Sequence, residues 1–431
     1  MDTTRLRIAI VGGVAGGASA ATRARRMNED AEITLFEKDE YVSFANCGLP
    51  YYIGGEIENR AKLLVATSEF LRRRFRLDVR TQQEVQRIDR ETKTLTVLNR
   101  ETGETYEQAY DKLILAPGAS PLVPPLDGAD ARNVFTLRNM ADTDAIKLAA
   151  ENCPSKRAVV VGSGFIGLEM VEQLVQLGFQ TSLAELQPQI LPLMDPEMAK
   201  PLEETLRRHN VSVHLGDGIQ RVLTDGSGTA SGVELQSGTA VPGDVVILGL
   251  GVRPNVKLAM DAGLEVGAGG GIATDQAMRT NDPDIYAVGD AAEYTYGPTG
   301  QPMRIALAGP ANRAGRLAGE HAATGKSSPA APVLGTSIVR VFDRSAGMTG
   351  LTAGLANRLG IAASSVTIVA NDHAGYFPGA TPITLKLTFD PQSGKILGAQ
   401  AVGGAGVDKR IDVLATAMAL NGTVRDLAEL D

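Results

Sequence analysis

The sequence of 431 residues contains only two cysteines, Cys47 and Cys153. Two cysteines cannot build a disulfide framework, and their scarcity is typical of a protein of a reducing compartment. The chain also lacks a run of about 18 apolar residues, so no membrane span is expected. The formal net charge of -8 argues against nucleic acid as a partner. An apolar run starts at Leu6 and leaves no room for a secretory signal, so we expect a cytoplasmic protein.

Glycine, in contrast, is abundant, and it clusters in turns after apolar runs. The run from Leu6 to Val11 ends at Gly12-Gly13, an alanine-rich helical segment follows over 15–27, and a second strand is predicted over 32–37. This order of strand, glycine turn, helix and strand is typical of a dinucleotide-binding unit. The spacing is irregular, because a valine stands where the middle glycine is expected. The candidate binding residues of this first site are Gly12, Gly13, Gly17 and Glu37.

A second, regular fingerprint follows the predicted strand over 157–161. Gly162, Gly164 and Gly167 have the spacing that permits a tight turn, close approach of a pyrophosphate and close packing of helix on strand. Glu185 ends the next predicted strand, where a carboxylate can accept hydrogen bonds from ribose hydroxyls. Because a carboxylate repels a 2'-phosphate, this site predicts a preference for NADH over NADPH. The alternative is a glycine-rich turn that binds no nucleotide.

A later buried strand, predicted over 284–289, delivers Asp290 onto a glycine turn. A carboxylate at this place can accept hydrogen bonds from the ribityl chain of a flavin. It can also cap the following helix, and the two roles can coexist. If this strand completes the first sheet, the second nucleotide-binding unit is inserted into the first. From about residue 332 the pattern changes to strands of a mixed sheet and one amphipathic helix, which predicts a third domain.

Cys47 lies in the run Ser43-Phe44-Ala45-Asn46-Cys47-Gly48-Leu49-Pro50, at a predicted turn into a short helix. A helix N-terminus or nearby positive charge activates a thiol, because the thiolate is the reactive form. The alternative is a buried, inert cysteine. Cys153 sits in a predicted loop before the second nucleotide-binding unit, so Cys47 is expected to act alone. Two dinucleotide sites and one thiol indicate a flavoprotein that carries electrons from a nicotinamide to sulfur or oxygen.

Two groups of arginines accompany this cysteine. Arg23, Arg25 and Arg26 lie on the predicted helix of the first unit, and a second basic run covers residues 72–76. These side chains are either a solvated face or a docking surface for a phosphorylated thiol such as coenzyme A, held by charge-assisted hydrogen bonds.

The segment 43–55 resembles the signature of the single-cysteine pyridine-nucleotide disulfide oxidoreductases, and in particular the coenzyme A-disulfide reductases and the NAD(P)H-dependent persulfide and polysulfide reductases. The resemblance continues through residues 162–167, Asp290, 308–313 and 373–380, and so covers essentially the whole chain. It implies an α/β fold with two Rossmann-like domains and a C-terminal α+β dimerisation domain. The expected domains are 1–118 with 246–328 for FAD, 119–245 for NAD(P)H, inserted in the first, and 332–431 for dimerisation.

The resemblance also implies roles for individual residues. Cys47 would be the redox nucleophile that forms a mixed disulfide with coenzyme A, and Tyr376 would assist protonation of the departing thiolate. The alternative for Tyr376 is an ordinary aromatic residue in a turn. The bound cofactors would be FAD and NADH or NADPH, with no metal, and the protein would be a homodimer. The residues that would line the coenzyme A site are Ser19, Arg23, Arg26, Ser43, Asn46, Arg74 and Asn312.

Two rival functions remain open on the sequence. In an NADH oxidase or peroxidase, Cys47 would cycle through sulfenic acid with oxygen or peroxide as the acceptor. In a flavin redox sensor, the same cofactors would be present without turnover. The resemblance further implies that the family continues beyond Asp431 with a second active-site tyrosine, in some members followed by a rhodanese domain. We therefore expect the sequence to be a truncated version of a longer protein.

Overall fold

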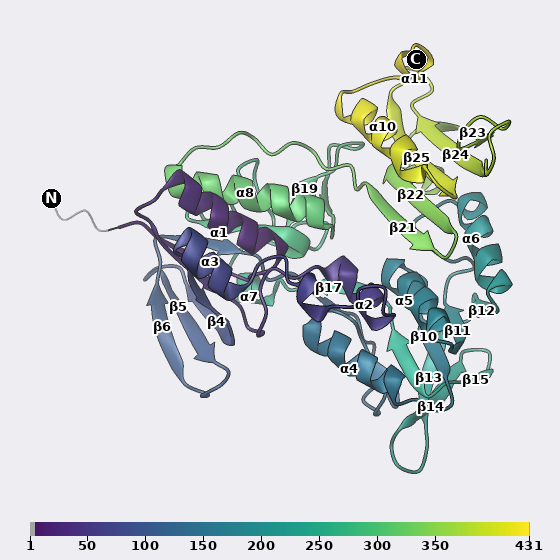
Figure 1. Cartoon of the computed structure of the whole chain (residues 1–431). Helices are drawn as coiled ribbons and strands as arrows, with labels where there is room; N and C mark the ends of the chain where they lie inside the picture. The colour runs from purple at the N-terminus through teal and green to yellow at the C-terminus, as the bar shows by residue number, and fades with distance from the viewer. Residues whose placement is uncertain (1–4, 431) are drawn as a thin grey trace. The chain divides into compact units, whose positions relative to one another are not determined.

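The computed structural model describes residues 5–430, which divide into two compact units. The first unit comprises the chain up to Asn46 together with residues 59–120 and 252–333, and the second comprises residues 47–58, 121–251 and the chain from Leu334 onward. Each unit is therefore assembled from three separate stretches, which the colours of Figure 1 allow the reader to follow.

A five-stranded parallel sheet forms the centre of the first unit. Its order is β18-β7-β1-β2-β3, from β1 (Arg7–Val11), β2 (Glu32–Phe36), β3 (Asp78–Arg80), β7 (Lys112–Leu115) and β18 (Ile285–Ala287). Ile8 and Ile10 on one face and Ala9 on the other are almost completely buried, as the continuous apolar pattern of a strand covered on both faces requires. Because β18 pairs in parallel with β7, the chain returns to this sheet after it has built the sheet of the second unit.

Helices α1 (Ala15–Met27) and α8 (Ala308–Thr324) lie side by side in the first unit (Figure 1). Small residues make this close packing possible: a Cβ atom on Gly315 would lie 2.1 Å from the Gly16 carbonyl oxygen, and one on Gly319 would lie 2.3 Å from the Ala20 oxygen. The remaining elements of this unit are η2 (Arg60–Leu63), α3 (Ser68–Phe75), β4 (Gln83–Asp89), β5 (Thr94–Asn99), β6 (Thr105–Ala109), β8 (Ala119–Pro121), β17 (Val252–Pro254), α7 (Lys257–Asp261), η3 (Gly289–Ala291), β19 (Glu293–Thr295) and β20 (Pro302–Arg304).

The second unit contains another five-stranded parallel sheet. Its order is β12-β11-β10-β16-β9, from β9 (Val134–Phe135), β10 (Arg157–Val161), β11 (Gln180–Glu185), β12 (Ser212–Leu215) and β16 (Val245–Leu248). The expected domain boundary between residues 245 and 246 falls inside β16. All four residues of β16 are buried and pair with β10 or β9, so the chain leaves this sheet only after residue 248. The division between the units lies at residues 251–252 instead.

The other elements of this half of the second unit surround its sheet. They are η1 (Asn46–Gly48), which begins at the last residue before the unit, α2 (Leu49–Ile53), α4 (Met140–Glu151), α5 (Phe165–Gln176), α6 (Pro196–Arg208), β13 (Ile219–Thr224), β14 (Ala230–Leu235) and β15 (Ala240–Pro242). Helix α2 packs on α4 and α5, which brings the segment after Cys47 onto the helix that follows the regular glycine turn.

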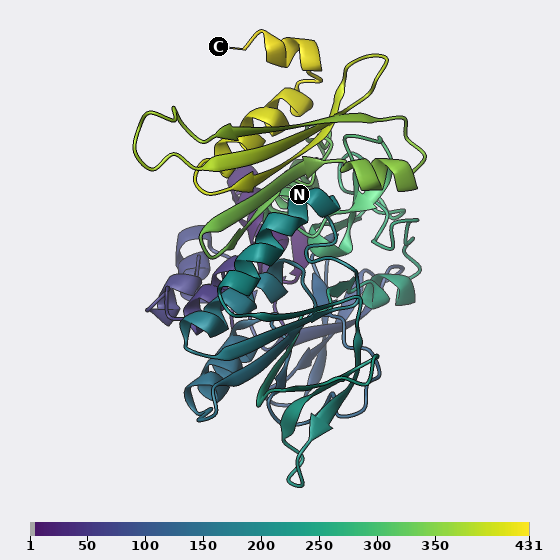
Figure 2. The same ribbon diagram turned by 90° about the vertical axis from the view of Figure 1, so that its right-hand side faces the viewer.

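The C-terminal residues also belong to the second unit. They form a sheet of order β21-β22-β25-β24-β23, with α10 packed on one face (Figure 2). Its strand pairs are antiparallel throughout, which corrects the expectation of a mixed sheet. The elements are β21 (Ser337–Val341), β22 (Arg344–Gly350), α9 (Ala353–Arg358), β23 (Ser364–Asn371), β24 (Pro382–Phe389), β25 (Ile396–Gly403), α10 (Val407–Ala419) and α11 (Val424–Ala428).

A buried ion pair connects the C-terminal sheet with the start of α6 in the same unit. The Lys386 ammonium group in β24 lies 2.7 Å from a carboxylate oxygen of Asp195, directly before α6, and both side chains are almost fully buried. Gln400 of β25 donates to the same carboxylate over 2.7 Å. Removing one partner from such a pair leaves an uncompensated buried charge, so the sheet and α6 are strongly connected. In the described residues, no helix is long and apolar enough to cross a membrane.

Candidate active site

The irregular glycine turn of the first unit has the geometry of a dinucleotide-binding turn. Gly12 has a φ of +96°, and a Cβ atom on it would lie 2.0 Å from the Ala116 carbonyl oxygen. A Cβ atom on Gly17 would lie 1.8 Å from the Gly12 oxygen. Both positions therefore require glycine, whereas Val14 serves as the N-cap residue of α1 and needs no positive φ. The valine that made the sequence pattern irregular occupies a place where a side chain is tolerated.

Glu37 lies at the end of β2 and is hydrogen-bonded to this turn. The Gly13 N–H donates to its Oε2 over 2.8 Å, and the Asp39 N–H donates to its Oε1 over 3.0 Å. Burial raises the pKa of Glu37, and the two backbone N–H groups oppose that rise. The carboxylate is thus fixed beside the glycine turn.

The regular turn of the second unit repeats this arrangement. Gly162 has a φ of +98°, and a Cβ atom on Gly167 would lie 2.0 Å from the Gly162 oxygen. Gly164, in contrast, would point a Cβ atom into open space, with no atom within 4 Å. Packing within the protein requires glycine at positions 162 and 167. Gly164 leaves the backbone open on the side from which a pyrophosphate would approach the N-terminus of α5.

Glu185 corresponds to Glu37 in this second site. Its Oε2 accepts hydrogen bonds from the Ser163 N–H over 2.8 Å and the Ser163 hydroxyl over 2.6 Å, and its Oε1 accepts the Gln187 N–H over 2.8 Å. In both units, therefore, a buried carboxylate after the second strand holds the glycine turn through one oxygen and its own loop through the other. The two units carry the same kind of glycine turn.

Asp290 lies in the one-turn helix η3, directly after Gly289, which has a φ of +80°. The Tyr294 hydroxyl accepts the Gly289 N–H over 2.8 Å and donates to the Gly289 oxygen over 3.0 Å. Tyr294 thus fixes the turn that carries Asp290. No local sequence pattern predicted this role of Tyr294. The helix-cap alternative for Asp290 is wrong, because Val288 is the cap residue of η3 and α8 begins only at residue 308.

Cys47 occupies the middle of η1 and is exposed, whereas Cys153 is buried. The alternative of a buried cysteine is therefore wrong for Cys47. The loop before Cys47 is anchored by Ser43, which has a φ of +48°. Its N–H donates to the Gly13 oxygen over 2.9 Å and its oxygen accepts the Val65 N–H over 2.8 Å. The chain that leads to Asn46 and Cys47 is thereby held on the first glycine turn.

Three of the residues expected to bind coenzyme A connect α1 and α8. The Ser19 hydroxyl donates to the Asn312 side-chain oxygen over 2.9 Å, so these two are brought together as expected. Arg23 pairs with Glu320 at 2.5 Å, an acidic partner that the sequence did not reveal. Part of the positive charge of Arg23 is therefore balanced within the first unit.

Arg26 and Arg74 gather on one aromatic ring. Their guanidinium carbons lie 5.2 and 5.8 Å from the centre of the Phe75 ring. Both side chains are exposed, and within residues 5–430 neither has an acidic partner. Arg25 instead is buried and donates to the carbonyl oxygens of Phe75 and Arg76 at the end of α3. Phe75 was not among the predicted site residues, although its position inside the arginine run 72–76 could have indicated a contact with the arginines.

Tyr376 lies in the loop between β23 and β24 and is 91% exposed. Phe377 in the same loop and Val366 and Val369 in β23 are also exposed. All eight residues of β23 are exposed. Tyr376 is therefore an exposed residue of the loop that follows the edge strand β23 of the C-terminal sheet.

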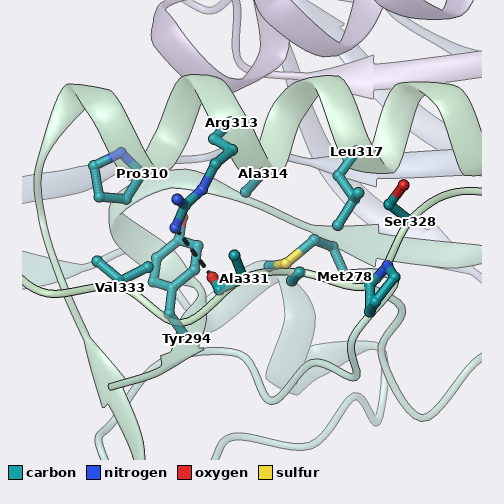
Figure 3. A pocket seen from close by; sticks show the side chains of 11 residues that line it. Met278, Tyr294, Pro310, Arg313, Ala314, Leu317, Ser328, Ala331 and Val333 are labelled. Carbon is teal, nitrogen blue, oxygen red and sulfur yellow. Dashed lines mark hydrogen bonds between the residues drawn. The ribbon is translucent and has the colours of Figure 1, made fainter. Parts of the chain in front are cut away.

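A separate cavity of about 220 Å³ lies beneath α8 in the first unit. Figure 3 shows Met278, Tyr294 and Leu317 around it, with Arg313 donating to the Ala331 oxygen over 3.0 Å. None of the predicted site residues lines this cavity, so we assign it no part in the site.

Two binding turns in separate sheets and one exposed cysteine define an oxidoreductase of the nucleotide-dependent, thiol-based class. The family described as pyridine nucleotide-disulphide oxidoreductase matches residues 6–315, and the dimerisation domain of that family matches residues 336–430. The chain belongs to the pyridine nucleotide-disulphide oxidoreductase family. The resemblance stated from the sequence and the expected fold class are thus confirmed.

Individual proteins are similar over nearly the whole chain. A coenzyme A disulfide reductase of Staphylococcus haemolyticus is 36% identical over 425 residues, which are 99% of this chain and 94% of that protein. The crystal structure of reduced Bacillus anthracis CoADR-RHD has a TM-score of 0.96 at 46% identity and matches 99% of this chain and 76% of its own. The structure of a NAD-dependent persulfide reductase from A. fulgidus has a TM-score of 0.95 at 36% identity, with 99% and 79% coverage.

Proposed function

We propose that this protein is an FAD-dependent reductase that uses NADH to reduce coenzyme A disulfide, or a coenzyme A persulfide or polysulfide, through Cys47. The observation that carries the proposal is one exposed thiol in a chain with two dinucleotide-binding turns. The similarity to a coenzyme A disulfide reductase and a persulfide reductase supports it.

FAD fits the first unit. Gly12 and Gly17 are packed too closely for any side chain, Glu37 is fixed where it can accept from a ribose, and Asp290 is held on a turn where it can accept from the ribityl chain. When bound, FAD accepts a hydride from the nicotinamide and passes two electrons on to sulfur. The chain's contribution is to bind and orient the group through these residues.

The nicotinamide nucleotide fits the second unit. The backbone at Gly164 is open for the pyrophosphate, and the N-terminus of α5 offers N–H donors and a partial positive charge. Glu185 is held by three donors from residues 163 and 187. We propose that the Glu185 carboxylate faces the ribose of the bound nucleotide and repels the 2'-phosphate of NADPH, which gives a preference for NADH.

Coenzyme A would be recognised by its phosphates. Arg26 and Arg74 have no acidic partner within residues 5–430 and lie over Phe75, so both guanidinium groups have donors available for phosphate oxygens. Ser19, Arg23, Ser43, Asn46 and Asn312 are proposed as further contacts of this substrate. Asn46 directly precedes the reactive cysteine in the chain.

The proposed chemistry at Cys47 has two steps. The Cys47 thiolate attacks one sulfur of coenzyme A disulfide, forms a mixed disulfide and releases one coenzyme A thiolate, which takes up a proton. Two electrons that originate from NADH then cleave the mixed disulfide and return the Cys47 thiolate and the second coenzyme A thiol. The sum is NADH, one proton and one disulfide converted to NAD and two thiols.

The C-terminal sheet is proposed to form a homodimer. Its edge strand β23 and the following loop expose apolar side chains together with Tyr376, and the sequence of this region matches a dimerisation domain. Burying such a surface removes apolar area from water. We propose that Tyr376 assists protonation of the leaving thiolate. The expected second tyrosine and rhodanese domain concern residues beyond Asp431 and lie outside the described residues.

The test is the intact mass of protein purified without reductant, measured before and after dithiothreitol. We expect a coenzyme A adduct that dithiothreitol removes, that Cys47→Ser lacks and that the matched variant Cys153→Ser retains. An unmodified or sulfenic Cys47, with no thiol released, would contradict the proposal in favour of oxygen or peroxide as acceptor. A flavin that NADH bleaches and no acceptor restores would point to a redox sensor instead.

A further inference from the structure

The segment after Cys47 is attached to the second unit by side chains of α4 and α5. The Tyr51 hydroxyl donates to Glu169 Oε1 over 3.3 Å, and the Lys147 ammonium group donates to the Tyr52 oxygen over 3.3 Å. Gln173 donates to Glu56 Oε1 over 2.8 Å. Residues 47–58 therefore belong by contact to the second unit, although the residues before and after them belong to the first.

Arg340, from strand β21 of the C-terminal sheet, completes this attachment. One terminal nitrogen of its guanidinium group donates to Glu56 Oε2 over 3.1 Å, and the other donates to Glu56 Oε1 and lies 2.6 Å from Glu172 Oε1. The same guanidinium group lies 5.1 Å from the centre of the Tyr51 ring. One side chain thus contacts two residues of the cysteine-bearing segment and one residue of α5.

The geometry leaves little freedom in this cluster. Glu172 is 1% exposed, and its second oxygen accepts the Phe342 N–H over 2.9 Å. A Cβ atom on Gly54 would lie 1.8 Å from Gln173 Oε1, so the segment passes directly over α5. The contacts join positions 284 and 168 residues apart in sequence, and no local motif could have predicted them.

The charges of the cluster depend on Arg340. Three carboxyl groups, Glu56, Glu169 and Glu172, surround this one guanidinium group. Arg340 lowers the pKa of Glu56 by a direct hydrogen bond. Burial raises the pKa of Glu169 to about 7, and the Tyr51 hydrogen bond and Arg340 oppose that rise while Glu172 adds to it. Without Arg340, the almost fully buried Glu172 would lose its only cationic partner within residues 5–430.

We infer that Arg340 is a positioning residue for the redox cysteine: it holds residues 47–58 against α5, so that Cys47 is presented to its disulfide substrate in one orientation. This inference rests on the proposed role of Cys47. Attack on a disulfide requires the thiolate to be aligned with the sulfur–sulfur bond, and a displacement of about 1 Å can cost a large part of the rate. Arg340 thereby connects the C-terminal sheet with the reactive residue without contacting the substrate.

The test compares Arg340→Gln, Arg340→Lys and the matched control Arg358→Gln in the holoenzyme. Arg358 lies at the end of α9 in the same unit and is exposed. For Arg340→Gln we expect kcat for coenzyme A disulfide to fall about tenfold while KM changes less than about twofold, because alignment rather than binding is lost. Flavin reduction by NADH, measured separately by stopped flow, should remain within about twofold of the unchanged protein.

A conservative variant, Arg340→Lys, distinguishes a positioning role of Arg340 from a general effect on stability. Arg340→Lys keeps the charge but not the forked donors, so its kcat should lie between those of Arg340→Gln and the unchanged protein, and Arg358→Gln should change neither rate. If Arg340→Gln does not fold, Glu56→Gln removes the partner charge and should show the same split. Equal slowing of both half-reactions, or no slowing of either, would overturn the inference. If Cys47→Ser still turned over the disulfide, the proposed function itself would be wrong, which is a distinguishable result.

Discussion

Replacing Glu169 by glutamine should stabilise the protein, and by more at high pH than at low pH. The carboxyl group accepts a hydrogen bond from Tyr51 and lies in a half-buried place beside Glu172 and Arg340. Burial raises its pKa from 4.5 to about 7. Glu169→Gln reproduces the shape of the protonated carboxyl group and keeps an oxygen that can accept from Tyr51, but it cannot ionise.

The direction of the pH effect on the free energy of unfolding follows from the difference in the pKa of Glu169 between the folded and the unfolded chain. The unfolded chain releases the Glu169 proton near pH 4.5, whereas the folded chain keeps it until about pH 7. The contribution of Glu169 to the free energy of unfolding therefore declines as pH rises from about 4.5 to about 7, and above this range it declines no further. The resulting gain of Glu169→Gln over the unchanged protein is about 1 kcal/mol at pH 5 and about 3 kcal/mol at pH 8.

The assay is urea unfolding of the holoenzyme at pH 5 and pH 8, followed by far-ultraviolet circular dichroism. The midpoint of Glu169→Gln should rise at pH 8 by roughly 0.5 M more than at pH 5. Glu204→Gln is the control, since Glu204 is an exposed carboxylate of α6 in the same unit, and it should produce a smaller difference. Equal midpoint shifts at both pH values, or a loss of stability at pH 8, would show that the folded protein holds Glu169 ionised.

Three further predictions concern the binding sites. Gly17→Val should abolish FAD retention, whereas Gly167→Val should retain FAD but slow flavin reduction by NADH more than about tenfold. In each variant the added Cβ atom would collide with a backbone oxygen of its own turn. FAD content and stopped-flow absorbance measure these effects, and the reverse pattern would mean that the two nucleotides bind to the opposite units. Glu185→Gln should reduce the ratio of kcat/KM for NADH over NADPH about tenfold, since it removes the charge that repels the 2'-phosphate; an unchanged ratio contradicts this role. Arg26→Gln and Arg74→Gln should each raise KM for coenzyme A disulfide about fivefold but not KM for a disulfide without phosphates, and equal effects on both substrates would exclude phosphate recognition.

The two nucleotide-binding turns could be predicted because their determinants are local. Strand, glycines and helix follow within about 20 residues, and the requirement for glycine at positions 12, 17, 162 and 167 comes from contacts within one turn or with the neighbouring strand. Glu37 and Glu185 could be read in the same way, since each ends the next strand. The order of strand, glycine turn and helix is visible in one short stretch of sequence, although Gly12 and Gly162 also approach Ala116 and Gly249 from later in the chain.

The surroundings of the cysteine could not be predicted from such patterns. Arg340 and Glu56 are distant in sequence, Tyr294 holds the turn before Asp290 without any motif, and Arg23 proved to have the acidic partner Glu320. Long-range pairs depend on which faces of the elements meet, and composition does not determine that. The expected domain boundary at residue 245 differs from the division at residues 251–252 for a similar reason, because strand pairing, and not the apolar run itself, decides to which sheet β16 belongs.

The central claim is that Cys47 carries the exchange with sulfur while nucleotide binding and flavin reduction do not need it. The most direct measurement is the pair of half-reactions of Cys47→Ser, with Cys153→Ser as the control. We predict that NADH bleaches the flavin of both variants at a rate within about twofold of the unchanged protein, and that only Cys153→Ser goes on to oxidise NADH with coenzyme A disulfide. Sustained reduction of coenzyme A disulfide by Cys47→Ser, or loss of its flavin reduction, would contradict the account.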